Sequence, residues 1–457
     1  MQHETLFEQL SPTRLFARCA LPSMVSMAMT SLYTVADGIF VGRYVGSDAL
    51  AAVNLVMPVI MMGFALSDMI AVGSSVQISI HLGEKKPLEA NRIFSFCSAL
   101  IVAISCVVGL AGWFLAEPIL RLMGADGGVT ALAVSYLRVY AAFAPLVTIY
   151  FAVDNYLRIC GKVRYSMGLN VFTALLNLVL DYLFLVVLGR GVAAAAVASC
   201  LSLGLGTVLG YAPFLAKKLP LRFVRGRPPL ARLGRLLANG SSEFFSSISG
   251  SITMLLFNSV LLGLAGSTAV AAFSIVMYVS SVVGSLLFGM ADALQPAISY
   301  NYGAGNRSRM FALEARVLEA SAAVSLVTMV LLRLGGGGIV SLFIQAQDTA
   351  LLDMSLRAMA LFALSYLTDW AATALSSFFT ALNRPGLSLS LAFSRALLFP
   401  VVCLTVLPRL WGLDGVWLTP FAASLFSALL SAVFLCIVLR QERTRTAATG
   451  DALPTGE

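Results

Sequence analysis

One nineteen-residue stretch, residues 170–188, constrains this chain more than any other. It reads NVFTALLNLVLDYLFLVVL, which is long and apolar enough to cross a bilayer as a helix, and it carries one carboxylate, Asp181, in its interior. A charge at that depth costs about 2.5–3.5 kcal/mol on insertion scales. Asn177 precedes Asp181 by one turn, so the two side chains share a face. The pattern indicates an ion or proton site; a buried acid satisfied by a neighbouring helix is the alternative.

Composition extends this reading to the whole chain. The sequence is 59% hydrophobic and 11% charged, whereas soluble domains are about 25% charged. A spanning helix needs about 20 apolar residues, so twelve spans with short connections use nearly all of the 457 residues. We therefore predict an all-α, multi-pass integral membrane protein with no sizeable soluble domain.

Apolar runs and their breaks predict the positions of twelve helices. We expect them at 15–41, 49–81, 90–116, 128–160, 163–188, 191–217, 236–263, 268–302, 309–333, 350–382, 386–408 and 414–440.

The same composition argues against several function classes. The seven cysteines form no CxxC pair, and the two histidines, His3 and His81, are too far apart for a zinc site. The sequence contains no GxxxxGK[ST] motif, and the net charge of +8 comes from basic residues between apolar runs, which argues against nucleic-acid binding. A membrane-embedded enzyme would need clustered His, Asp or Cys residues near a lipid interface, and the sequence contains no such cluster. We therefore expect no enzyme activity and no cofactor, and an ion gradient as the energy source.

The distribution of Lys and Arg predicts orientation in the cell membrane. Most of the 30 basic residues fall on one set of helix ends and loops, including the segment 217–235. This assigns both termini to the cytoplasm. The residues left on the opposite side are Arg43, Arg121, Arg138, Arg190, Arg333, Arg357 and Arg409.

An internal repeat predicts two halves. VGSDALAAVNLVMPV at 45–59 aligns with AGSTAVAAFSIVMYV at 265–279, and 13 of the 39 positions between 45–83 and 265–303 are identical. With six helices in each half, the halves run in the same direction, related by a pseudo-two-fold axis along the membrane normal, with a site expected between them. We predict an N-terminal lobe at 1–216, a basic cytoplasmic linker at 217–235, a C-terminal lobe at 236–440 and a cytoplasmic tail at 441–457.

These segments resemble the multidrug and toxic-compound extrusion (MATE) transporters over essentially the whole chain. The motifs that carry the resemblance are DGIFVGRYVGSDALAAV at 37–53, NYLRICGK at 155–162, LNLVLDYLFL at 176–185, QPAISYNYGAGN at 295–306 and GLDGVWLTP at 412–420. The resemblance implies a cation-driven exporter of amphipathic, often cationic, organic molecules.

The resemblance also implies site residues. Asp37 matches the first-helix acid and Pro22 the proline at which that helix bends. The implied ion-coupling set, for H⁺ or Na⁺ and no other metal, is Asp37, Asp181, Asn177, Asn155 and Ser199, with Asp154 beside Asn155 as the alternative fourth-helix position. A second-lobe ion or substrate site would use Glu243, Tyr366 and Asp369.

We therefore predict a monomeric antiporter that exports organic cations by alternating access, with membrane lipids around it. The alternative is a flippase for a lipid-linked saccharide, which would favour a strongly cationic cavity.

Overall fold

The computed structural model describes residues 4–123, 127–226, 230–341 and 349–449, and every regular element within them is helical. Ten of the helical stretches are long and apolar enough to cross a membrane. Two of these ten are interrupted by non-helical backbone, one at Gly266 and one at Trp411 and Gly412. Dividing them there gives the twelve spans that the sequence predicts.

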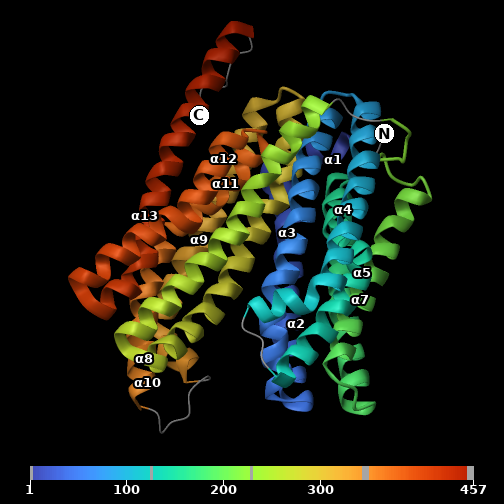
Figure 1. Cartoon of the computed structure of the whole chain (residues 1–457). Helices are drawn as coiled ribbons and strands as arrows, with labels where there is room; N and C mark the ends of the chain where they lie inside the picture. The colour runs from blue at the N-terminus through green and yellow to red at the C-terminus, as the bar shows by residue number, and fades with distance from the viewer. Residues whose placement is uncertain (1–3, 124–126, 227–229, 342–348, 450–457) are drawn as a thin grey trace. The chain divides into compact units, whose positions relative to one another are not determined.

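The helices follow one another through short connections (Figure 1). Up to residue 215 they are α1 (Glu4–Gln9), α2 (Pro12–Phe40), η1 (Val41–Val45), α3 (Ser47–Gly83), α4 (Pro87–Leu122), α5 (Gly127–Ile159), α6 (Val163–Asp181), η2 (Tyr182–Val187) and α7 (Val192–Leu215). The rest are α8 (Leu230–Gly303), α9 (Arg307–Val340), α10 (Thr349–Phe362), η3 (Ala363–Leu367), α11 (Asp369–Ala381), α12 (Pro385–Phe393), η4 (Ser394–Leu398) and α13 (Phe399–Thr449).

The described residues fall into two compact units. Unit 1 contains the residues up to Leu10 and Leu21–Phe244, and unit 2 contains Ser11–Ala20 and the chain from Phe245 onward. One division falls between α1 and α2, and the other two fall within helices, inside α2 and inside α8.

The turns of the two halves repeat. Left-handed backbone, which glycine adopts most easily, recurs at separations of 220 to 223 residues. The pairs are Gly46 and Gly266, Lys85 and Gly305, Gly161 and Asn383, and Gly189 and Gly412. The duplication seen in the sequence is therefore also a duplication of backbone conformation.

Unit 1 is built around α5. Helices α3 and α4 pack against it and against each other, and α7 packs on it as well (Figure 1). Aromatic rings fill the interior near the α5 C-terminus, where Phe94 lies 5.1 Å from both Tyr156 and Phe214, measured between ring centroids.

The first turns of α8 belong to unit 1 because they cross α3 at backbone contact. A Cβ at Gly240 would lie 1.8 Å from the Met69 carbonyl oxygen, and one at Gly73 would lie 2.2 Å from that of Leu236. Glycine on each helix lets the two backbones touch.

Part of the predicted linker at 217–235 makes contacts with unit 1. Leu219 and Leu221 are buried, and the Arg222 and Val224 amides donate to Asn91 and Ser95 on α4, at 2.9 and 2.8 Å. Residues 219–224 therefore pack on unit 1 through their leucines and backbone donors. The last residues of the predicted linker are already part of α8.

Two further boundaries differ from prediction. The predicted tail from 441 begins inside α13, where buried Glu442 pairs with Arg307 at 3.1 Å and with Arg384 at 3.2 Å. Helix α9 continues past 333 through four glycines to Val340. Gly336 faces α10, since a Cβ there would lie in ordinary contact with Met359 at 3.6 Å.

Candidate functional site

The two acids singled out by the sequence meet inside unit 1. Asp37 comes from α2 and Asp181 from the last turn of α6, and their carboxyl groups lie close enough to interact directly. Their exposed fractions are 7% and 0%. Each keeps one buried oxygen, Oδ1, without a hydrogen-bond partner among the described residues. Two facing carboxyls with free oxygens can hold a cation or share a proton.

Asn177 and Ser199 complete this cluster. In the amide orientation that satisfies both neighbours, Asn177 donates to Asp181 Oδ2 at 3.1 Å, and its oxygen accepts from Ser199 Oγ at 3.1 Å. Asn177 reaches Asp181 because they are one turn apart on α6, and α7 brings Ser199 alongside. Both side chains are buried.

The helices change pitch beside the acids. Helix α2 passes into the π-helical turn η1 shortly after Asp37, and α6 passes into η2 directly after Asp181. The two π-helical segments contact each other. Such wide turns concentrate at functional sites, because they release the regular hydrogen-bond ladder.

A chain of polar side chains leads away from the acids along α5 and α6. Thr173 borders the same small cavity as Asn177 and Ser199, and its hydroxyl lies 3.3 Å from that of Tyr150. Tyr150 donates to Asn170 Oδ1 at 2.5 Å.

The chain continues to a buried ion pair. Asn170 donates to Asp154 at 2.9 Å, Ser166 also donates to Asp154, and Arg158 pairs with it at 2.6 Å. The side chain of Asn155, the predicted fourth-helix amide, is not part of this network among the described residues. The alternative, Asp154, faces α6.

The sequence placed Arg158, the basic residue of this pair, at the cytoplasmic end of the predicted helix 128–160. Its side chain is 5% exposed. The signal that could have placed it is the spacing of four residues from Asp154, which brings opposite charges together on a helix.

Pro22 lies within the continuous helix α2, one residue after the boundary between the two units in that helix. A proline there removes one backbone hydrogen bond, which is compatible with the predicted bend.

The second predicted site is divided between the units. Glu243 lies in unit 1, whereas Tyr366 and Asp369 lie in unit 2. Tyr366 is buried, and Asp369 borders a cavity of about 260 Å³. Arg395, which the sequence assigned to a cytoplasmic helix end, lines the same cavity, with a side-chain nitrogen 4.0 Å from the Asp369 carboxylate. Its proximity offsets the negative charge of Asp369, so this site differs in charge from the acid pair.

Sequence reasoning missed one further acid. Glu314 on α9 is 3% exposed, and its Oε1 has no hydrogen-bond partner among the described residues. It lies one turn into the predicted helix 309–333, close to the basic residues at the start of that helix, and no motif marked it. Among the described residues, no group of three or more His, Cys, Asp or Glu side chains could hold a metal ion.

Comparison with known proteins supports the duplicated architecture. The MatE family model matches residues 22–183 and again 244–405. The chain belongs to the MatE family. Members of this family are multidrug efflux transporters that use ion gradients, not enzymes, and the chain is accordingly a multi-pass membrane transporter of small molecules.

Relatives that match over nearly their whole length support the same family. The chain is 25% identical over 447 residues to the multidrug export protein MepA of Staphylococcus aureus strain MSSA476, covering 96% of both chains. It is 24% identical over 443 residues to MepA of Staphylococcus saprophyticus, again covering 96% of both.

Solved structures show the same two-lobed fold. A MATE transporter in complex with MaL6 superposes with a TM-score of 0.91 at 24% identity, covering 99% of this chain and all of that one. An outward-facing multidrug resistance MATE family transporter of the MOP superfamily gives 0.88 at 25% identity, with 98% of both chains covered.

Proposed function

We propose that this MatE transporter is an antiporter that exports amphipathic, mostly cationic organic compounds in exchange for H⁺ or Na⁺, by alternating access. The facing carboxyls of Asp37 and Asp181 carry this proposal. Among the described residues, both acids are buried and neither forms an ion pair. By contrast, Asp154 pairs with Arg158, and Asp369 lies beside Arg395.

Of the two ions, the proton fits the surrounding groups better. Asn177 turns its N–H toward Asp181 and its oxygen toward Ser199. The amide oxygen is therefore directed away from a cation bound at Asp181, whereas Na⁺ needs oxygen ligands. A proton needs only the two carboxyls, which share one more easily than they carry two charges.

The organic cation is supported by the aromatic surroundings of the acids. Tyr33, Tyr136 and Tyr140 lie near Asp37. Ring faces and carboxylates together replace part of the water that a cation loses. The names of the relatives, multidrug export proteins, support export of varied small molecules.

Purified protein in liposomes tests both parts. A pH gradient should drive export of ethidium, and ethidium added without a gradient should release protons from detergent-solubilised protein. Export that follows an Na⁺ gradient at constant pH would assign Na⁺ instead. Failure to move a broad panel of organic cations, together with movement of a lipid-linked saccharide, would establish the flippase alternative.

We further propose that the transporter is a monomer in the plasma membrane with both termini in the cytoplasm. The orientation is supported by the excess of Lys and Arg in the loops on the side assigned to the cytoplasm. A reporter fused after Glu457 should show a cytoplasmic signal, and one fused after Gly189 an external signal. Equal signals would overturn the orientation.

A further inference from the structure

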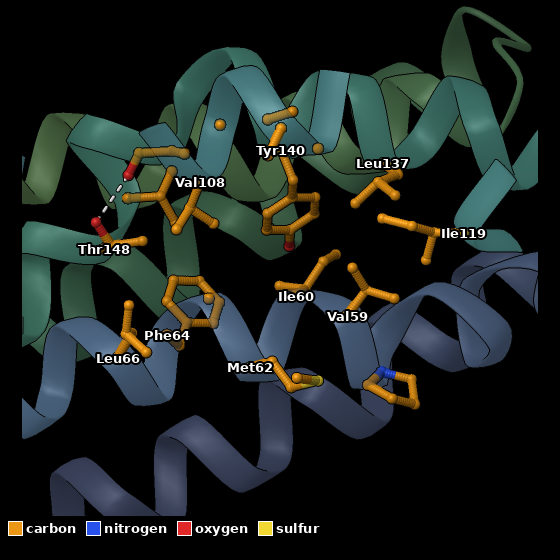
Figure 2. Close-up of a pocket in the computed structure, with 18 of the residues that line it drawn as sticks. Val59, Ile60, Met62, Phe64, Leu66, Val108, Ile119, Leu137, Tyr140 and Thr148 are labelled. Atoms are coloured by element: carbon orange, nitrogen blue, oxygen red, sulfur yellow. Dashed lines mark hydrogen bonds between the residues drawn. The ribbon is translucent and has the colours of Figure 1, made fainter. Parts of the chain in front are cut away.

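A cavity in unit 1 is lined by neither acid of the pair. It has a volume of about 450 Å³ and lies among α3, α4 and α5 (Figure 2). Among the described residues no charged side chain lines it, and its polar contributors are Tyr140 and Thr148. The Thr148 hydroxyl is already bonded to the Ala144 carbonyl, at 2.9 Å. The cavity therefore suits an uncharged hydrocarbon group.

Small residues border the cavity on all three helices. Gly63 on α3, Gly109 and Gly112 on α4, and Ala141 and Ala144 on α5 border it. Close packing normally leaves few voids larger than a water molecule in a protein interior. For scale, a cavity of about 150 Å³ takes up benzene, so this one has room for roughly three groups of that size.

The helices around the cavity also present an exposed apolar surface. Among the described residues, α4 packs mainly against α3 and α5. Its remaining surface is apolar and exposed, with Leu110 at 60% and Phe114 at 72%. Exposed Met62 and Met123 border the cavity itself. In a membrane, the molecules that surround such a surface are lipid chains.

We propose that this cavity is a binding site for one hydrocarbon chain of a membrane lipid. The chain enters beside α4 between Met62 and Met123 and lies against Gly63 and Gly112. Figure 2 shows Tyr140 reaching from α5 toward Ile60 on α3, across the space that the chain occupies.

Tyr140 gives the site a connection to the acid pair. Its ring lines the cavity, and its hydroxyl group lies close to Ser199, with Asp37 nearby. A chain in the cavity packs on this ring and holds it against α7. The lipid site and the ion site thus share one side chain without sharing a ligand.

Photo-crosslinking tests the proposal. Wild-type protein is placed in phosphatidylethanolamine vesicles in which a fraction of the lipid carries a diazirine in mid-chain, and adducts are located by mass spectrometry. We expect adducts at Met62 and Met123 in excess of those at Phe114, which is more exposed but does not line the cavity.

The variant Gly63→Leu fills the cavity. A Cβ at Gly63 meets only Val108, at 3.4 Å, so the helix tolerates the change. Because the new side chain takes the space of at least two methylene groups, we expect roughly tenfold fewer adducts at Met62 and Met123. Adducts at Phe114 should not change, which also reports that the variant is folded.

Gly168→Leu is the matched control, since a Cβ there meets nothing within 4 Å and the position is remote from the cavity lining. It should label like wild type. Equal labelling of Met62, Met123 and Phe114, or labelling that Gly63→Leu leaves unchanged, would overturn the proposal. Loss of the adducts on adding ethidium would also overturn it, by assigning the cavity to an exported compound.

Discussion

The two halves of the chain use the same backbone turn for different chemistry. The turn after α5 is closed by a hydrogen bond from the Lys162 amide to the Leu157 carbonyl, at 2.9 Å, and the turn after α11 by one from Arg384 to Phe379, at 3.0 Å. These turns are 222 residues apart, the same separation as the starts of the two family matches at residues 22 and 244.

The side chains beside these two turns differ in charge. In unit 1, Asp154 and Arg158 form an ion pair to which Ser166 adds a hydrogen bond. The residues 222 positions later are Ser376, Thr380 and Ser388, where Thr380 and Ser388 bond through their hydroxyls at 2.5 Å. The same separation relates Asp181 to Cys403. The two halves share the backbone turn, but at these matched positions only unit 1 carries charged side chains.

The largest expected effect comes from removing charge where the halves differ most. Asp181→Asn and Asp37→Asn each keep side-chain size but cannot carry the ion, so pH-driven ethidium efflux in proteoliposomes should fall to the level of empty liposomes. Cys403→Ser, at the matching position in unit 2, should transport like wild type. Full coupled transport by either Asn variant would place the coupling site elsewhere.

The next effect concerns the ion pair. Arg158→Met leaves the Asp154 carboxylate buried without its cation, and breaking a buried pair costs about 3–5 kcal/mol. Thermal unfolding of the detergent-solubilised protein should show this as a clearly lower midpoint. The double variant Asp154→Asn with Arg158→Met should regain much of the loss, because no charge remains unpaired. No recovery would mean that packing, and not charge, sets the cost.

The matching change in unit 2 should cost less. Thr380→Val removes a neutral hydrogen bond to Ser388, which contributes about 1 kcal/mol. The same thermal assay should therefore give a smaller decrease than Arg158→Met. An equal decrease would show that the hydroxyl pair stabilises its helix junction as strongly as the ion pair.

The smallest effect is expected at the mixed-charge cavity of unit 2. Arg395 and Asp369 are 4.0 Å apart and partly exposed, and such pairs contribute at most about 1 kcal/mol. Arg395→Met should lower the unfolding midpoint only slightly and leave ion-driven efflux intact. Loss of coupling in this variant would move part of the ion pathway into unit 2.

Much of the molecule was fixed by its linear pattern. Apolar runs of spanning length predicted twelve helices, because the hydrocarbon thickness sets their length. The repeat at 45–59 and 265–279 predicted the duplication. Asn177 and Asp181 were identified together because a helix places residues four apart on one face.

Tertiary structure decided what the periodic pattern leaves open. Whether Asp154 or Asn155 faces α6 depends on the rotation of α5, which a helix that is apolar all round does not specify. The segment 217–235 was predicted to be a linker because it is polar. In the structure, Leu219 and Leu221 are buried, and the Arg222 and Val224 amides donate hydrogen bonds to α4.

The buried acids show most clearly what the sequence determined and what only the tertiary structure decided. The sequence alone determined that Asp37 and Asp181 lie in apolar helices, because their neighbours in the chain are apolar. Only the fold decided that these two meet without a cation, whereas Asp154 meets Arg158 and Asp369 meets Arg395. The physical reason is that the electrostatic state of a buried acid depends on distances of a few ångströms between helices, and those distances are set by packing.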